Sequence, residues 1–590
     1  CTIDYNNYYK PSGTAYYGNS YTSLAAWVSA KSQDVNSTTI DPGFGTSPTN
    51  LIPTNWSMCP VMNEVSTDID GKLRIGITYK GCYTAVFNVD AGITEFVGIG
   101  PKVSAGTNAI NVRLMNCGTD TLKSISVQCS VDGITQTAVN LSGLSLTQYQ
   151  DTVITIGSFV VSVNTTYNLK AWTFNPNGTT DQNIGNDTTT HSTVGCLQVL
   201  NGTYDIAGGN NDFATISDAM NALTTCGVSG PVILRLASGN YTTLNSFSTV
   251  YSGTNATNTV TFTSLTGNAN DVRIGATSSN ALVLNGAKYL RFENVTIGDT
   301  TGGTTYGVYF QNMNENIDFY RCNIYSSVTT TSTSYIPVYY NATSSGQCLK
   351  NVRFIANNIK GGYVNMCLYS SSSVGTNNMG SITIDSNIMT QGYRGGFSRS
   401  VTSSYSYYMY FPSISYNTII GRAASSSYQY GIALGSVYNA PYNYYSYYDV
   451  VDKMVGNRIN LQITSNYGCG ISLGYYLNYY TFDGISGSGT QSLIANNEII
   501  HSSANGQTYG IYSYYSKAYL LHNSIYLNST SSSSMYGMYI SNTSTGYGPM
   551  TIKNNILSIH HPASYPTSGY PIYFQNGGVY LTQAYKIIDG

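Results

Sequence analysis

A polar turn followed by isoleucine or leucine recurs along the second half of the chain, at intervals of roughly 26 to 40 residues. The turns are anchored at Cys322, Asn357, Ser386, Asn417, Asn457, Asn497, Asn523 and Asn554. Irregular repetition of this kind is typical of a solenoid, in which each repeat forms one coil of a continuous stack. The intervening strands are short, bounded by Asn and Gly, and rich in Tyr and β-branched residues. This pattern favours a parallel β-helix over an array of helices.

A second motif falls between these turns and places a small residue or proline among aromatic and aliphatic ones. It is centred on Gly307, Gly431, Gly470, Gly510, Gly537 and Pro571. Asn suits the corner of a coil because it tolerates left-handed backbone angles and because stacked amides can hydrogen-bond along the axis. The alternative is that Asn is merely frequent in this composition. We predict an asparagine ladder at Asn357, Asn417, Asn457, Asn497, Asn523 and Asn554, continued by Asn6 of an adjoining copy.

The segment 212–225 has the clearest helical pattern of the chain. Its apolar residues recur at helical spacing, and Thr215 with Asp218 has the residue types of a capping box. A solenoid has to cover its first coil because an open strand edge pairs with other chains. We predict that helix 212–225 closes the N-terminal end of a β-helix that spans 196–590.

The two ends of the sequence read as two halves of one coil. If Gly590 were followed by Cys1 of another copy, Asn6 would continue the anchor series after Asn554. Residues 1–90 would then supply the terminal coils and the C-terminal cap of the preceding copy. The chain is accordingly predicted to be a permuted cut through a tandem protein, or a subunit whose open end its neighbour completes. The predicted copy junction consists of Asp589, Gly590, Cys1 and Thr2.

Residues 91–195 have a different rhythm. Their segments alternate apolar and polar residues at strand spacing and are separated by turns such as Asn175–Gly178. About 100 residues of this kind is the size of an immunoglobulin-like sandwich. The predicted fold class is therefore all-β, with this sandwich between the two solenoid pieces.

Composition limits the classes of partner. Charged residues make up 9% of the chain and the formal net charge is -2, so nothing indicates binding to nucleic acid or to an anionic membrane. No apolar run approaches the roughly 18 to 20 residues of a membrane span, and no cleavable signal sequence is present.

The chain has 11 cysteines, and none of them has the CxxC spacing of zinc or redox sites. Disulfides in an oxidising, extracellular setting are the favoured use. Proximity suggests the pairs Cys59–Cys82, Cys117–Cys129 and Cys196–Cys226, although sequence does not determine connectivity. The odd number leaves one cysteine over, and an acylated Cys1 of a lipoprotein is an alternative.

A polysaccharide-cleaving enzyme is the rival to a structural role. Such chemistry needs paired or clustered carboxylates. Only Asp449 and Asp452, with Lys453 and Arg458 nearby, form a local charged group, and a solvated loop is the alternative to a substrate site. The remaining acidic residues that we considered in the solenoid are dispersed over many coils: Asp318, Asp385, Asp483 and Glu498. We predict no catalytic residue.

Asp68 and Asp70 precede a glycine with the alternation that suits an oxygen-ligand loop for calcium. The other ligands of an EF-hand loop are missing, and a turn held by Asp side chains is the alternative. We predict no other cofactor.

Three Tyr-rich insertions lie between consecutive coils, at 403–411, 438–449 and 474–482. Tyr offers a large contact area and a polar tip, so these loops suit a contact between copies or a glycan-binding face. Simple stacking of one coil on the next is the alternative. The candidate residues are Tyr407, Tyr408, Tyr444, Tyr445, Tyr447, Tyr448, Tyr475, Tyr476, Tyr479 and Tyr480.

Residues 200–236 resemble the start of right-handed β-helix domains in giant repetitive surface proteins of gliding, type IX secreting bacteria. Residues 90–187 resemble the CARDB-type Ig-like domain found between such helices, and 4–9, 22–44 and 66–74 resemble the segment that ends them. The resemblance implies a right-handed β-helix, a cell-surface location and a role in adhesion or gliding. Asp-Thr sequences resemble the O-glycan acceptor sites of the same bacteria at Thr121, Thr152, Thr188 and Thr300.

These features together predict an extracellular structural protein whose copies join end to end through the open β-helix end into a surface filament or adhesin. Its expected partners are other copies of itself and a surface polysaccharide or glycan. The alternative is a β-helix enzyme or binding protein for polysaccharides.

Overall fold

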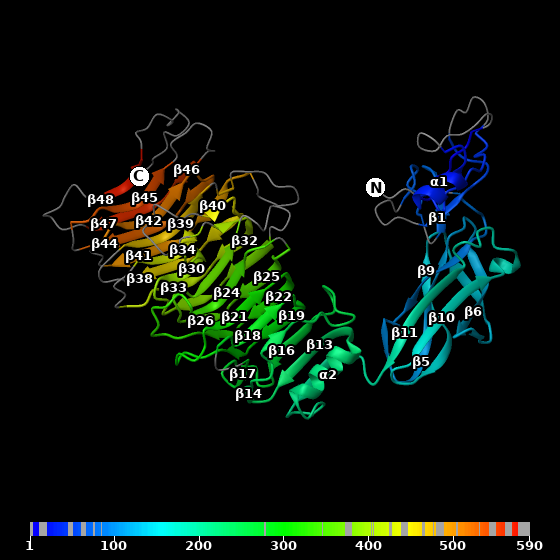
Figure 1. Cartoon of the computed structure of the whole chain (residues 1–590), viewed down its shortest axis with the longest axis horizontal. Coiled ribbons are helices and arrows are strands. Elements are labelled where there is room, and N and C mark those ends of the chain that lie inside the picture. Colours follow the sequence, from blue (N-terminus) through cyan, green and yellow to red (C-terminus); the bar gives the residue numbers. More distant parts are fainter. Residues whose placement is uncertain are drawn as a thin grey trace. The chain divides into compact units, whose positions relative to one another are not determined.

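The computed structural model shows two compact units, Cys1–Val199 and Leu200–Gly590 (Figure 1). It describes all residues except 1–3, 11–20, 45–50, 61–66, 75–76, 84, 276–278, 345, 372–379, 403, 405, 424–427, 438–445, 463–466, 476, 479–488, 503–505, 530–531, 542–549, 561–568 and 576–590. The predicted junction residues Cys1, Thr2, Asp589 and Gly590 therefore lie outside the described residues.

The second unit is a parallel β-helix built from three faces, as the sequence repeats predict (Figure 1). The first face starts with β12 (Leu200–Ile206), β13 (Val228–Leu236), β16 (Val260–Ser264), β19 (Lys288–Glu293), β22 (Asn314–Tyr320), β25 (Leu349–Ile355), β28 (Gly380–Asp385), β32 (Met409–Ser415) and β36 (Val450–Val451). A further sheet follows, formed by β37 (Lys453–Val455), β40 (Ser492–Ala495), β43 (Ala518–Leu521) and β46 (Met550–Lys553).

The second face carries the strands that follow the polar turns. They are β14 (Gly239–Tyr241), β17 (Val272–Ile274), β20 (Thr296–Ile297), β23 (Asn323–Tyr325), β26 (Asn358–Lys360), β29 (Ile388–Thr390), β33 (Thr418–Ile420), β38 (Arg458–Leu461), β41 (Glu498–Ser502), β44 (Ser524–Asn528) and β47 (Ile556–His560).

The third face carries the glycine motif. Its strands are β15 (Ser246–Phe247), β18 (Leu282–Asn285), β21 (Tyr306–Gln311), β24 (Ile336–Ala342), β27 (Met366–Ser370), β30 (Gly395–Ser400), β34 (Gln429–Ser436), β39 (Gly468–Tyr475), β42 (Thr508–Tyr514), β45 (Met535–Ser541) and β48 (Gly569–Phe574). Two short strands join it at one side, β31 (Ser406–Tyr407) and β35 (Ser446–Tyr447).

An asparagine ladder runs along the corner before the second face. In each coil the side-chain Oδ1 accepts both the backbone N–H and the Nδ2 group of the preceding Asn, as Asn457 does from Asn417 at 3.0 Å each. The Nδ2 group of Asn457 in turn donates to Asn497 Oδ1 at 2.9 Å and to the carbonyl of Ile414 at 2.9 Å. Every amide hydrogen and both oxygen lone pairs are thereby used inside the buried corner. The members are Asn357, Asn387, Asn417, Asn457, Asn497, Asn523 and Asn555.

The ladder Asn lies one residue after the predicted ladder residue Asn554 and one residue after the turn anchor Ser386. Asn387, not the anchor Ser386, and Asn555, not Asn554, make the ladder bonds. The residue before each ladder Asn has the left-handed backbone, with φ of 60° at Ser386 and 56° at Asn554. The prediction gave the left-handed turn and the ladder hydrogen bonds to one Asn. In the structure they belong to consecutive residues: the first turns the chain and the second makes the ladder bonds.

The isoleucine two residues after a ladder Asn packs against a glycine of the third face in four coils, those of Asn417, Asn457, Asn497 and Asn523. A Cβ added to Gly470 would lie 2.4 Å from Ile499 Cγ2, and one added to Gly510 would lie 2.4 Å from Ile525 Cγ2. No side chain fits there, so the two sequence motifs are the two sides of one contact. The rest of the interior contains stacked rings, including Phe292, Phe319 and Phe354, whose centroids are 5.2 and 5.0 Å apart.

Helix α2 (Ile216–Cys226) packs against the first coil, where Figure 1 places it beside β13. It starts later than the predicted 212–225 because Thr215 is its N-cap and forms a capping box with Asp218. Asp212 instead accepts the backbone N–H of Asp205 at 2.7 Å.

The sandwich of the first unit consists of two sheets around their own core. One is antiparallel and contains β3 (Ala91–Val97), β5 (Gly106–Asn116) and β9 (Asp151–Val161). The other contains β4 (Lys102–Ser104), β11 (Thr188–Cys196), β10 (Thr166–Phe174), β6 (Leu122–Val131), β7 (Ile134–Thr135) and β8 (Val139–Leu146). A short 3-10 turn, η1 (Pro176–Gly178), follows β10.

The described residues before the sandwich include one parallel bridge, between Asn7 and Thr38, and the terminal coils proposed for 1–90 stay a prediction. These residues also contain helix α1 (Leu24–Lys31) and an antiparallel pair, β1 (Met58–Pro60) and β2 (Ile77–Tyr79). Asp34 organises this part, since its carboxylate accepts hydrogen bonds from Asn6 Nδ2, Tyr8 OH, Trp27 Nε1 and Ser37 Oγ. Asn6 is therefore part of a local polar cluster in this chain, and its place in a ladder with an adjoining copy stays a prediction. In the described ranges, no helix is long and apolar enough to span a membrane.

His501 is a polar exception inside the β-helix. It lies on β41 between Leu461 and Leu527 of the neighbouring coils, and neither ring nitrogen has a hydrogen-bond partner among the described residues. Burial lowers the pKa of His501 to about 4, so the buried ring is neutral at physiological pH.

We expect Asn523→Ala to weaken the ladder strongly. It removes four hydrogen bonds and leaves buried groups of both neighbouring coils unsatisfied, a loss of about 3 to 5 kcal/mol. Urea denaturation and hydrogen exchange at β41 and β44 measure it. The matched control is Asn554→Gly, which keeps the left-handed turn and lies outside the ladder. Equal stability of the two variants would contradict the ladder's role.

We expect His501→Leu to flatten the pH dependence of β-helix stability. Unfolded His501 binds a proton near pH 6.5 and folded His501 only near pH 4. Its contribution to stability is therefore present above pH 6.5 and is lost as the pH falls toward 4. On going from about pH 7 to about pH 5, the wild type should lose about 2 kcal/mol more than the variant in urea denaturation. The same loss in both proteins would exclude His501 as the cause.

Candidate functional site

The Tyr-rich insertions lie next to one another along one side of the β-helix. Strand β31 pairs with β35 in register, Ser406 with Ser446, and β35 continues through Tyr447 to Tyr475 of β39. Only the backbone of Tyr447 and Tyr475 is described. Five predicted residues lie outside the described residues: Tyr444, Tyr445, Tyr476, Tyr479 and Tyr480.

Tyr408 and Tyr448 follow these paired strands and stack on each other. Their ring centroids are 5.5 Å apart with an interplanar angle of 18°, and Tyr407 lies 5.8 Å from Tyr408. Both residues have a left-handed backbone, with φ of 51° at Tyr408 and 64° at Tyr448. The same turn therefore follows β31 and β35. Each ring is half-buried. Coil-to-coil stacking, which the sequence left as an alternative, thus describes Tyr408 and Tyr448.

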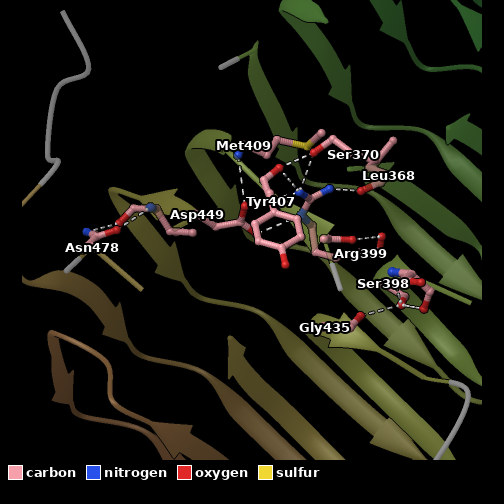
Figure 2. Close-up of polar contacts among 12 residues, drawn as sticks. Leu368, Ser370, Ser398, Arg399, Tyr407, Met409, Gly435, Asp449 and Asn478 are labelled. Atoms are coloured by element: carbon pink, nitrogen blue, oxygen red, sulfur yellow. Dashed lines mark hydrogen bonds and ion pairs between the residues drawn. The ribbon is translucent and has the colours of Figure 1, made fainter. Parts of the chain in front are cut away.

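A buried ion pair anchors the base of this aromatic cluster (Figure 2). Arg399 of β30 and Asp449 before β36 have side chains that are 0% and 1% exposed. The guanidinium Nε donates to Asp449 Oδ2 at 2.8 Å and Nη2 donates to Oδ1 at 3.2 Å. This is the bidentate geometry in which Arg and a carboxylate interact most strongly.

The remaining polar groups of Arg399 and Asp449 connect several strands (Figure 2). Arg399 also donates to the carbonyls of Leu368 and Tyr407 and to Ser370 Oγ, while Asp449 Oδ1 accepts the backbone N–H of Met409. The carbonyl of Asp449 accepts the backbone N–H of Asn478 at 3.1 Å. One charged pair therefore connects the insertion 403–411 with the end of the insertion 438–449 and with Leu368 of β27.

The local charged group around Asp449 does not converge on a substrate site. Asp449 is enclosed with Arg399, whereas Asp452 accepts the hydroxyl of Tyr410 at 2.6 Å. Burial raises the pKa of Asp452. Arg458 lies near Glu498 in an exposed pair, with 3.6 Å between Nε and Oε2. Asp449 and Asp452 flank β36, whereas Arg458 is the first residue of β38, and each of the three has a different partner.

The other acidic residues of the β-helix are also engaged locally. Asp318 pairs with Arg353, with Nε at 2.6 Å from Oδ1, and Asp385 accepts from Ser413 and from the backbone of Ser415. Asp483 lies outside the described residues.

Asp68 and Asp70 form a turn in the structure. Asp68 Oδ1 accepts the backbone N–H groups of Asp70 and Lys72, both at 2.9 Å, and Asp70 pairs with Lys72 at 3.3 Å. Across the described residues, no group of three or more His, Cys, Asp or Glu side chains is placed to hold a metal ion.

Cys196 and Cys226 are disulfide-bonded. The other two predicted pairs are wrong, since Cys59, Cys82, Cys117 and Cys129 are free thiols. Cys59 lies opposite Thr78 in the β1–β2 pair, whereas Cys82 is exposed beyond the end of β2. Cys117 precedes β6, whereas Cys129 lies on β6 seven residues after its first residue, Leu122. Seven extended residues span about 20 Å. The thiol of Cys129 instead faces the carbonyl of Ile156. A short separation in sequence does not predict a disulfide where the intervening residues form an extended strand, because the strand holds the two cysteines apart.

The O-glycan candidates lie on both units. Thr188 is exposed at the start of β11, and Thr152 and Thr300 are half-buried. Thr121 lines an open polar hollow of about 630 Å³ together with Asp120, Lys123 and Asn177.

Sequence reasoning missed Arg399, Asn387 and Asn478 because it followed repeated residues. Arg399 occurs once, in a strand whose residues are all buried. An isolated charge in an otherwise small and apolar strand was the available signal, since a buried charge requires a partner.

Comparisons with known proteins leave the family open. No protein-family model matches the chain, and no curated protein matches it. The CARDB domain of the PF1109 protein of Pyrococcus furiosus, solved in complex with di-metal ions, is 18% identical over 19% of this chain and 94% of its own, with a TM-score of 0.16. The solution structure of the same domain is 20% identical over 19% of this chain and all of its own, with a TM-score of 0.15. The family 28 exopolygalacturonase of Yersinia enterocolitica is 8% identical over 81% of this chain and 99% of its own, with a TM-score of 0.14. At such TM-scores these likenesses identify neither the family nor the activity of the chain.

We expect Asp449→Asn to destabilise the anchor by about 3 kcal/mol or more, because it leaves the buried guanidinium of Arg399 without its counter-charge. The double variant Arg399→Met, Asp449→Asn removes both charges and should recover most of the loss. Urea denaturation of the four proteins of this cycle gives the coupling energy, and hydrogen exchange at β31 and β36 locates it. A single variant as stable as the wild type would show that the pair is not the anchor.

Proposed function

We propose that this chain is a structural module of an extracellular surface protein and that its copies join end to end. The apolar helix α1 of one copy covers the last coil of the β-helix of another. In this way α1 does at the C-terminal end of the stack what α2 does at its N-terminal end.

The observation that carries the proposal is the state of the last described coil. Its inward side chains Leu557, Ile559, Ile572 and Phe574 are only partly buried. Their counterparts one coil earlier are almost fully buried: Ile525, Leu527, Met538 and Ile540. In the interior of the stack the following coil covers such side chains, so the last coil has an apolar surface that another element can cover.

Helix α1 offers a matching surface. Its sequence, LAAWVSAK, is mostly apolar, yet none of its side chains is buried. An apolar helix without a buried face is stabilised when it packs against a second apolar surface. The last ladder member also supports an open end at this coil. Asn555 Nδ2 donates to the carbonyl of Lys553 at 2.9 Å, where the other members donate to a further Asn.

The wider chemistry favours a structural role outside the cell. The disulfide-bonded Cys196 and Cys226 suit an oxidising compartment. The acidic residues that an enzyme would use as acid and base are held in ion pairs and turns, which favours a scaffold over polysaccharide cleavage.

Sedimentation velocity of the purified chain over a range of concentrations tests the proposal. We expect oligomers that grow with concentration, and electron micrographs of them should show end-to-end particles. Leu557→Lys on the last coil, or Val28→Lys on α1, should each reduce the apparent association constant at least about tenfold by placing a charge in an apolar contact. The control is Ile556→Lys, because Ile556 lies on the same coil but points outward and is 67% exposed.

A wild-type chain that stays monomeric at high concentration would overturn the assembly. Glycan binding at the stacked pair Tyr408 and Tyr448 would then be the remaining function, because a fixed aromatic pair suits a sugar surface.

A further inference from the structure

A cluster of buried acidic and amide side chains lies at one end of the sandwich, and the functional proposal above makes no use of it. It consists of Asp90, just before β3, and of Asp181, Asn183, Asn186 and Asp187 in the loop before β11. We call these five residues the sandwich acid cluster. Burying three carboxylates together is unfavourable unless something balances their charge.

Hydrogen bonds hold most of the cluster in place. Asp90 Oδ1 accepts Asn186 Nδ2 at 2.8 Å, and Asp90 Oδ2 accepts Asn183 Nδ2 at 3.2 Å. Asp181 accepts the backbone N–H groups of Ala91 at 2.9 Å and of Asn183 at 2.8 Å. The loop is thus fixed to the start of β3, and the oxygens are preorganised.

Two oxygens of the cluster have no partner. Asn186 is 4% exposed and Asp187 is 9% exposed, yet Asn186 Oδ1 and Asp187 Oδ1 make no hydrogen bond. The Asn186 amide donates through Nδ2 to Asp90, and the Asp187 carboxylate interacts with the hydroxyl of Thr173 and with the charges of Asp181 and Asp90. Buried oxygens without a donor are rare in folded proteins.

Two glycines, Gly92 and Gly118, let the backbone pack closely against the acid cluster. A Cβ on Gly92 would lie 2.8 Å from the carbonyl of Asn186 and 3.0 Å from its side-chain Cγ. A Cβ on Gly118 would lie 2.8 Å from the backbone nitrogen of Asp90. Both positions exclude any side chain, which lets the loop and the strand meet closely at the acid cluster.

No positive side chain balances the cluster. In the described part of the chain, none of the groups that act on the Asp90, Asp181 and Asp187 carboxylates is a Lys or Arg. Burial raises the pKa of Asp90 to about 6 and that of Asp187 to about 7, and it also raises the pKa of Asp181. The cluster is therefore unfavourable in its fully ionised form.

We propose that the sandwich acid cluster binds a hard divalent cation such as calcium, with Asp187 Oδ1 and Asn186 Oδ1 as ligands and Asp90 and Asp181 as the neighbouring charges. Calcium accepts carboxylate, amide and backbone oxygens in irregular geometry. A ligand set that includes amide oxygens is consistent with the lack of a site made from acidic, His or Cys side chains alone. The cation would fix the loop before β11 to the start of β3.

Equilibrium dialysis of the whole chain against calcium, after removal of metal with a chelator, tests the proposal directly. We expect one ion per chain to depend on the cluster and to be lost in Asp187→Asn, which keeps the shape of the side chain. Two controls should retain that ion. Asp151→Asn changes an exposed carboxylate of the same sandwich that pairs with Arg113, and Asp70→Asn changes the other candidate loop.

Hydrogen exchange gives a second readout that does not depend on the variant's folding. Calcium at about ten times its dissociation constant should slow exchange about tenfold in residues 90–93 and 181–187 of the wild type, if exchange there proceeds from an ion-free state. Magnesium tests selectivity between the two cations. No bound ion and no change of exchange with either cation would overturn the proposal, and the acid cluster would then hold protons instead.

Discussion

The β-helix depends on the buried amide of the ladder asparagines. An Asn side chain has two hydrogens and an oxygen with two lone pairs, and the interior positions of the ladder use all of them within the corner. The amide spans neighbouring coils, so each member fixes the register of the next. In the four coils from Asn417 to Asn523, the isoleucine two residues later then packs against a glycine of the third face. Core packing and strand pairing follow from that alignment.

The β-helix could be predicted from the sequence because its local signals repeat. The turn motif, the glycine motif and the capping box at Thr215 each describe contacts between residues whose positions recur in every coil or lie close in sequence. The ladder position is misplaced by one residue where either of two consecutive residues could be the one that forms the ladder bonds. Ser386 and Asn554 turn the chain, whereas Asn387 and Asn555 form the bonds.

The contacts that sequence could not reveal join residues far apart and occur only once. Asp34 draws Asn6 into a local polar cluster. The pair of Arg399 and Asp449 crosses 50 residues, and the sandwich acid cluster joins Asp90 to a loop about 90 residues later. No periodic pattern marks such pairs, and burial of charge in a chain with few charges was the physical hint.

The constancy of the three faces has a consequence for variation in this protein. The same three faces stack from coil to coil, although successive ladder Asn are 26 to 40 residues apart. The difference in length therefore falls between the strands, at the corners of the coils. Segments of different length and composition can therefore be exchanged at those corners without disturbing the coils above and below. A fold of this type can diversify what it displays while its backbone lattice stays the same.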